Sequence, residues 1–186
     1  MNNVNLNQKN MNIGGNFTQS VDNNIYIEST VELEKSQIYS CLTIFSNSTT
    51  PVAEMDIEKI PAELNVKLSY NHAGKYINIF ADRYLDIENI GKIIINDFPD
   101  GQTIISSLKT MFINSISDKD YNDDGSFTVN DGATLLDALY DQVKARITKD
   151  PRYDRNNLSV ETVEKFVYAF LGYGVSECQV LLNPNG

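Results

Sequence analysis

The chain has little histidine and cysteine, the residues from which most zinc sites and disulfide frameworks are built. Its 186 residues include one histidine, His72, and two cysteines, Cys41 and Cys178, which lie far apart and form no CxxC pair. Neither a zinc site nor a disulfide framework is therefore indicated, and we expect buried thiols. Without a second histidine, His72 offers no transition-metal cluster, and we interpret it as structural or exposed rather than catalytic.

Positive charge and long apolar runs are also scarce. The 15 Lys and Arg residues face 25 Asp and Glu residues, so the formal net charge is -10. Such a surface repels the phosphates of nucleic acids, and the scattered basic residues argue against direct binding to DNA or RNA. No stretch approaches the roughly 20 apolar residues of a membrane-spanning helix, and the Asn-rich start does not resemble a secretory signal. We therefore expect a soluble cytoplasmic protein without membrane contact.

The local motifs of common enzymes are missing as well. Gly14-Gly15 and Gly172-Tyr173-Gly174 form neither a phosphate-binding GxxxxGKS/T loop nor the glycine spacing of a dinucleotide site. No nucleophile-elbow pattern provides a serine partner for His72. We predict that the protein is not an enzyme. The sequence leaves open the alternative of an enzyme whose catalytic residues are dispersed along the chain.

The residues that are present predict a mainly α-helical fold with a short N-terminal β-hairpin and an extended C-terminal tail. A chain with 41% hydrophobic and 22% charged residues can form one globular domain with a short appended region. We divide it into residues 1–45 (a mobile Asn-rich leader, the hairpin and a short helix), a linker at 46–60, and a helical interaction domain at 61–186. The hairpin is predicted around Asp22-Asn23-Asn24, and the linker from the polar run that leads to Pro51.

Apolar residues recur at three- and four-residue steps through most of 61–186, which is the period of an amphipathic helix. This pattern predicts helices at about 61–70, 75–97, 105–116, 131–147 and 159–171. Ser159 is the predicted N-cap of the last helix. We expect Gly172 and Gly174 to end it, which leaves 175–184 as an extended tail or a short strand.

The stretch from Asp120 to Asp131 resembles a helix-flanked calcium loop. Oxygen ligands fall at the required spacing, and Gly125 stands where such a loop must turn sharply. Phe127 is expected to point into the core. The last ligand is an aspartate rather than the usual bidentate glutamate, so the predicted site is weaker or differently shaped. The candidate metal ligands are Asp120, Asn122, Asp124, Ser126 and Asp131.

The same residues also fit a polar connection between two helices, with no metal. Asp, Asn, Gly and Ser form turns readily because they tolerate unusual backbone angles and hydrogen-bond their own main chain. Asp131 is well placed as the N-cap of the next helix. No second loop of this kind occurs in the chain, although such loops normally come in pairs. A calcium-binding, EF-hand-like module is therefore the alternative function, with calcium as its cofactor.

Tyrosines are numerous in the predicted helical domain. Their rings combine apolar faces with polar tips, a composition favoured at protein interfaces but also common at the edge of a core. The sequence leaves open whether these tyrosines lie at a protein interface or at the edge of the core. They are Tyr70, Tyr76, Tyr84, Tyr140, Tyr168 and Tyr173.

The portion from Ile60 to Pro184 resembles the C-terminal domains of effector subunits in bacterial ABC three-component, or Lamassu-like, anti-phage systems. The resemblance rests on Ile60-Pro61, Lys67-Leu-Ser-Tyr70-Asn71, Lys75-Tyr76, and Phe170 followed by Cys178-Gln-Val-Leu-Leu-Asn-Pro184. In that family the domain connects an effector to an SMC-like ABC ATPase and a middle component. The resemblance implies an assembly role, and the expected interaction residues are Tyr70, Asn71, Tyr76 and Tyr84.

One departure from the larger members of that family concerns the effector. The short segment before Ile60 has no room for a nuclease, protease or hydrolase domain. We therefore expect an accessory subunit, or an isolated module whose enzymatic partner is encoded separately. The predicted function is a non-catalytic protein-interaction subunit of an anti-phage complex, with an ABC/SMC-type ATPase or a second copy of the chain as partner.

Overall fold

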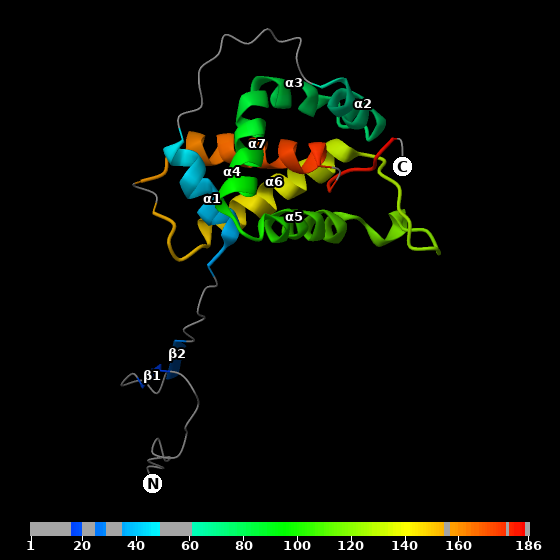
Figure 1. The fold of residues 1–186 in the computed structure, drawn as a ribbon. Helices are drawn as coiled ribbons and strands as arrows, with labels where there is room; N and C mark the ends of the chain where they lie inside the picture. Colours follow the sequence, from blue (N-terminus) through cyan, green and yellow to red (C-terminus); the bar gives the residue numbers. More distant parts are fainter. Residues whose placement is uncertain are drawn as a thin grey trace, which may run out of the picture. The chain divides into compact units, whose positions relative to one another are not determined.

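The chain forms two compact units, residues 1–34 and 35–186. The computed structural model describes residues 16–19, 25–28, 35–48, 61–154, 157–177 and 179–184. In the first unit, strand β1 (Asn16–Gln19) pairs antiparallel with strand β2 (Ile25–Glu28) (Figure 1). The predicted leader, the turn at 22–24 and most of the predicted linker at 46–60 lie outside the described residues.

The second unit is mainly helical, which confirms the predicted fold class at that level. An additional 3-10 helix, η2 (Asp118–Asp120), follows the fifth α-helix. Among the described residues, no helix is both long enough and apolar enough to cross a membrane. The α-helices that the structure describes are α1 (Gln37–Asn47), α2 (Ala62–Tyr70), α3 (Lys75–Asp82), α4 (Tyr84–Asp97), α5 (Gly101–Ser115), α6 (Gly132–Thr148) and α7 (Val160–Ser176) (Figure 1).

Helix α7 lies at the centre of this unit. It contacts α1, α3, α4, α5 and α6, and Figure 1 shows it running through the middle of the helices. Phe166, Val167, Phe170 and Leu171 are fully buried, because this helix is apolar around most of its circumference. Ser159 caps the helix as predicted, accepting a hydrogen bond from the Thr162 N–H at 3.1 Å.

Gly172 and Gly174 do not end α7, so this part of the sequence prediction is wrong. The helix continues through both glycines to Ser176. A Cβ atom at Gly172 would lie 2.4 Å from Cδ1 of Ile87 in α4, and one at Gly174 would lie 2.3 Å from Cδ2 of Leu108 in α5. Two neighbouring helices approach α7 at these positions, and the lack of a side chain makes room for them.

The predicted helix at 75–97 is divided into α3 and α4. Arg83 separates them with φ −112° and ψ 10°, outside the helical region. Figure 1 shows the two helices running in different directions, and both contact α7. No proline or glycine marks this break, and the apolar spacing continues across it. The break lets each helix keep its apolar face on the core, which periodicity alone does not reveal.

Helix α1 belongs to the second unit, whereas the sequence-based division grouped a helix ending at residue 45 with the N-terminal segment. It contacts α4, α6 and α7. Ile38, Leu42 and Phe45 are buried in this contact, and Cys41 is also buried, as expected for a structural thiol. Burial raises the pKa of the Cys41 thiol to about 12, so it stays protonated near neutral pH.

Asn71 joins three segments that are distant in the sequence. Its side chain donates to the carbonyl groups of Lys67 and Leu182, at 2.8 Å each, and accepts from the Leu182 N–H at 2.9 Å. Its backbone carbonyl accepts from the Gly132 N–H at 2.8 Å. The predicted tail at 175–184 begins too early, because residues 175 and 176 belong to α7. Leu181 and Leu182, after that helix, lie against the start of α6 and the end of α2.

Candidate functional site

The Asp-rich loop between α5 and α6 forms a narrow turn. Tyr121 and Phe127 form an antiparallel bridge, and inside it the Asn122 N–H donates to the Ser126 carbonyl at 2.8 Å. Gly125 has a φ of +81°, in the left-handed region that favours glycine, at the position where the sequence predicted a sharp turn. Phe127 packs against the core, as predicted.

The candidate ligands at the tip of this loop hydrogen-bond one another. Asp124 accepts from the backbone N–H and the hydroxyl of Ser126, at 2.9 and 2.6 Å. These bonds lower the pKa of the Asp124 carboxyl, and the side chain is exposed. The Asn122 amide donates to the same hydroxyl at 2.8 Å. The tip therefore forms a self-contained polar turn.

Asp120 and Asp131 lie at the two ends of the loop. Asp131 caps α6, accepting from the N–H and hydroxyl of Thr134 at 2.9 and 2.7 Å, and these bonds lower the pKa of its carboxyl. The predicted capping role is thus confirmed. Within the part of the chain that the structure describes, no three His, Cys, Asp or Glu side chains are grouped so that they could hold a metal ion. Calcium binding through the full set of oxygen ligands stays a prediction.

The four expected interaction residues do not form one surface. Tyr70 is 54% exposed at the end of α2, and Tyr84 is half-buried at the start of α4. Asn71 and Tyr76 are each only 1% exposed. The hydrogen-bonding groups of Asn71 hold the tail, and the Tyr76 hydroxyl donates to Asp137 Oδ1 at 2.7 Å. In this conformation these two residues do not reach a partner directly.

Three tyrosines from different helices do meet, and we call them the tyrosine strip: Tyr76 of α3, Tyr140 of α6 and Tyr168 of α7. The ring centroids of Tyr140 and Tyr168 are 4.8 Å apart, and those of Tyr76 and Tyr168 are 6.5 Å apart. Tyr140 and Tyr168 are half-buried. Their separations are typical of favourable aromatic pairs.

Two ion pairs flank the tyrosine strip. Lys75 pairs with Asp137 beside Tyr76, while Lys144 pairs with Glu164 at 3.2 Å. The Lys144 Nζ atom also lies 5.4 Å from the centre of the Tyr140 ring, within cation–π range. Each exposed positive charge at the strip therefore has an acidic partner nearby.

Tyr76 and Asp137, at one end of the strip, both have shifted pKa values. Burial raises the pKa of Tyr76, and the hydrogen bond to Asp137 raises it further. Burial tends to raise the pKa of Asp137, but hydrogen bonds from Lys75 and Tyr76 outweigh it, so its pKa is lowered. At neutral pH the phenol is therefore a neutral donor and the carboxylate a charged acceptor.

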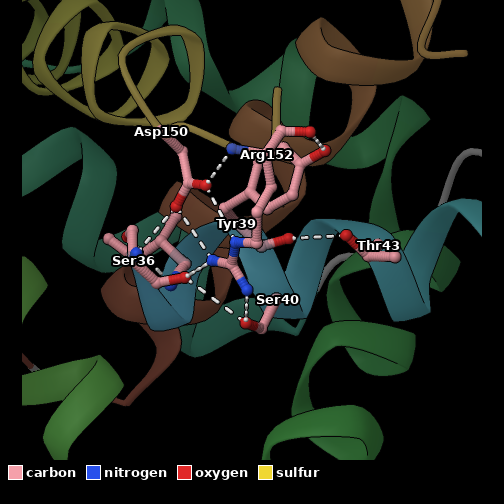
Figure 2. Close-up of polar contacts among 7 residues, drawn as sticks. Ser36, Tyr39, Ser40, Thr43, Asp150 and Arg152 are labelled. Carbon is pink, nitrogen blue, oxygen red and sulfur yellow. Dashed lines mark hydrogen bonds and ion pairs between the residues drawn. The ribbon is translucent and has the colours of Figure 1, made fainter. Parts of the chain in front are cut away.

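A second polar cluster lies where α1 meets the connection between α6 and α7 (Figure 2). Both oxygens of the buried Asp150 carboxylate are occupied. Oδ2 accepts from the Ser36 N–H at 2.7 Å and from Arg152 Nη2 at 2.8 Å, and Oδ1 accepts from Arg152 N and Nε at 2.9 Å each. Asp150 and Arg152, together with the Ser36 backbone, are called the clasp below.

Arg152 extends the clasp to α1. Its Nη2 donates to the Ser36 carbonyl at 2.7 Å and its Nη1 to the Ser40 hydroxyl at 3.0 Å. The guanidinium carbon lies 4.8 Å from the centre of the Tyr39 ring, and the Tyr39 hydroxyl donates to the Arg152 carbonyl at 2.7 Å. Figure 2 shows these groups converging from the helix and the connection. The clasp therefore fixes the first turn of α1.

We expect the clasp to make stability depend on acid pH. Hydrogen bonds from Arg152 are the main reason why the pKa of Asp150 falls from 3.8 to about 2. The unfolded chain therefore binds more protons between these values, and the stabilisation, roughly 2 kcal/mol, is complete above about pH 5 and lost as pH falls to 2. Urea unfolding at pH 6 and pH 2 should show that the stability advantage of wild type over Asp150→Asn shrinks by about this amount. An advantage that does not change with pH would contradict the assignment.

Local sequence could not reveal either cluster, because their members come from distant segments. Asp150 and Arg152 are visible as a nearby opposite-charge pair, but nothing in the sequence places Ser36 beside them. The pairing of Tyr140 with Tyr168 likewise depends on how α6 packs on α7.

Comparisons with protein-family models, with curated proteins and with solved structures found no match for this chain.

Proposed function

We propose that the chain is a non-catalytic protein-interaction subunit of a cytoplasmic bacterial anti-phage assembly, and that it binds an ABC/SMC-type ATPase through the tyrosine strip. The observation that carries this proposal is the ring contact between the half-buried Tyr140 and Tyr168, which come from separate helices, with the buried Tyr76 beside them. The resemblance of residues 60–184 to connector domains supplies the class of partner.

The tyrosine strip has the physical properties of a binding anchor. Tyr140 and Tyr168 hold each other in place by ring contact, so little side-chain freedom is lost when a partner covers them. Tyrosine is enriched among the residues that contribute most to binding energy at protein interfaces. The flanking pairs of Lys75 with Asp137 and Lys144 with Glu164 resemble the polar rim that surrounds such anchors.

The charge of the chain favours a basic partner surface. With a formal net charge of -10, the protein attracts positively charged faces and repels acidic ones. Association with a basic surface should be fastest at low ionic strength and slower as salt screens the attraction. This salt dependence separates the proposed complex from contacts that depend on apolar burial alone.

The proposal predicts that Tyr168→Ala weakens binding to an ABC/SMC-type ATPase, to be sought among the products of neighbouring genes. Loss of a central anchor typically costs at least about 2 kcal/mol, which corresponds to a roughly 30-fold rise in Kd. Calorimetry or surface plasmon resonance with the purified ATPase measures the change. Tyr168→Phe, which keeps the ring, should bind nearly as wild type does.

Tyr121→Ala is the matched control, because Tyr121 is a half-buried tyrosine outside the strip. Circular dichroism must show that each variant keeps its helical content. Failure of the wild-type protein to bind the ATPase would reject the proposed function. Equal binding by Tyr168→Ala and wild type would reject the tyrosine strip as the binding surface.

A further inference from the structure

Helices α6 and α7 together form a four-residue patch at one end of the tyrosine strip. Each helix contributes a tyrosine and a charged residue four positions apart, which is the spacing of neighbours on one helix face. Tyr140 meets Tyr168 at 4.8 Å between ring centroids, and Lys144 Nζ meets Glu164 Oε1 at 3.2 Å. The patch therefore places two aromatic rings beside an ion pair.

A positive charge of the chain itself already lies on this patch. The Nζ atom of Lys144 is 5.4 Å from the centre of the Tyr140 ring, and it donates a hydrogen bond to Glu164. That hydrogen bond is the main reason why the pKa of Lys144 is raised. An aromatic ring face and a carboxylate both stabilise a nearby cation. The patch has the chemistry of a cation site, and Lys144 is its internal occupant.

Lys144 is held on the patch only weakly. The side chains of Lys144 and Glu164 are 36% and 43% exposed, so water and salt compete with their ion pair. The ammonium group of lysine is a strongly hydrated point charge. A guanidinium group is planar and less hydrated, so it can stack on a ring and pair with both oxygens of a carboxylate. An arginine from another molecule can therefore replace Lys144.

The strip and its flanks carry one more negative charge than positive charge. The two lysines at the strip are each paired with a carboxylate, as described above. Asp141 of α6 adds a third carboxylate, which is exposed. Together with burial and the nearby Asp137, the charge of Asp141 contributes to the raised pKa of Tyr76, so it acts on the strip. This excess attracts a further cation.

We propose that the patch recognises an arginine side chain of the partner protein, whose guanidinium group takes the place of Lys144. The guanidinium stacks on Tyr140 and pairs with Glu164, while Lys144 turns to solvent. The inference rests on the proposed function for the class of partner, and it adds the chemistry by which the strip recognises that partner. The formal net charge of -10 favours the same kind of basic segment.

An NMR titration of the full chain with the peptide acetyl-Gly-Arg-Gly-amide tests this inference directly. With isotope-labelled tyrosine rings, the signals of Tyr140 and Tyr168 should shift with a Kd of about 1–10 mM, as expected for one exposed ion pair and one ring contact. The signal of Tyr121, which lies outside the strip, should stay in place. The same peptide with citrulline, which has the shape of arginine without its charge, should not bind. A lysine peptide should bind more weakly than the arginine peptide.

Lys144→Met removes the internal occupant and should therefore tighten binding. The Kd of the arginine peptide should fall by about 3- to 10-fold, because the peptide no longer competes with the ion pair and the ring contact of Lys144. Lys92→Met is the matched control, since Lys92 is an exposed lysine of α4. This control loses the same charge and should change Kd by less than about 2-fold.

Glu164→Gln removes the carboxylate that pairs with the guanidinium group. It should raise the Kd of the arginine peptide by about 3- to 10-fold, even though it also releases Lys144. Glu177→Gln loses the same charge at the other end of α7, where Glu177 is exposed, and should change Kd by less than about 2-fold.

Two results of the peptide titration would overturn the inference. One is that arginine and citrulline peptides shift the signals of Tyr140 and Tyr168 equally. The other is that Lys144→Met and Lys92→Met change Kd by the same factor.

The ATPase provides a separate readout, so failure of the inference and failure of the proposed function can be told apart. Lys144→Met should tighten binding of the ATPase more than Lys92→Met does. An ATPase that binds the wild type but does not distinguish these variants would overturn arginine recognition and leave the ATPase as partner. An ATPase that does not bind, while the peptide binds with the expected gain in Lys144→Met, would reject the proposed function and support arginine recognition.

Discussion

Arg152→Ala should lower the free energy of unfolding by about 3 kcal/mol, because it leaves the buried Asp150 carboxylate without its charged partner. Asp150 is fully buried at its side chain, whereas that of Arg152 is 34% exposed. Water can reach the vacated position from the exposed side, which is why we expect the lower end of the range for a broken buried pair. Urea unfolding followed by circular dichroism near pH 7 measures the loss. A small domain is typically stable by 5–15 kcal/mol, so this effect is a large fraction of the total.

Arg146→Ala is the matched control for this experiment. Arg146 is exposed on α6 and donates from Nη1 to the Ser107 hydroxyl at 2.7 Å, without a buried carboxylate. Its removal should cost at most about 1 kcal/mol. Arg152→Lys should lie between the two, because lysine keeps the charge but cannot form the paired bonds to Asp150. Equal losses for Arg152→Ala and Arg146→Ala would show that the clasp does not stabilise the fold.

Asn71→Ala should lower the free energy of unfolding by a similar amount, about 3 kcal/mol, for a different reason. The mutation removes the partner of the Leu182 N–H and of the Leu182 carbonyl, whereas the Lys67 carbonyl keeps the hydrogen bond from the backbone N–H of residue 71. A polar group left buried without a hydrogen bond costs about 1–3 kcal/mol, and the two groups of Leu182 lose their partner together. Chemical denaturation measures the change in stability, and hydrogen exchange should show faster exchange at the Leu182 amide.

Asn78→Ala is the comparison for Asn71→Ala, since Asn78 is an exposed asparagine of α3 and should tolerate truncation within about 0.5 kcal/mol. The experiment also separates two roles for Asn71. A variant that keeps its stability but no longer binds the ATPase would support the sequence-based expectation of a direct contact. A variant that loses stability would show that Asn71 acts by holding the tail against α2 and α6.

Local sequence was sufficient to predict the positions of most of the helices and two of their N-caps. Helices α2, α5 and α6 lie close to their predicted positions, and α7 begins as predicted after Ser159. Asp131 and Ser159 accept hydrogen bonds from N–H groups three residues later, a short-range arrangement that the sequence alone specifies. Apolar periodicity reports which face of a helix is buried, so the helical class followed directly from it.

What the sequence determined by itself was therefore the mainly helical class, the turn at Gly125 and the N-caps of α6 and α7. Only the tertiary structure decided that Gly172 and Gly174 lie inside a helix, that α3 and α4 separate at Arg83, and that Asn71 is buried. It also decided which tyrosines meet and which helix the clasp holds. The physical reason is the sequence separation of the residues involved. Caps and periodicity depend on neighbours within about one or two helical turns. Close helix approach, ring contact and buried hydrogen bonds depend on residues that come together only when the helices pack.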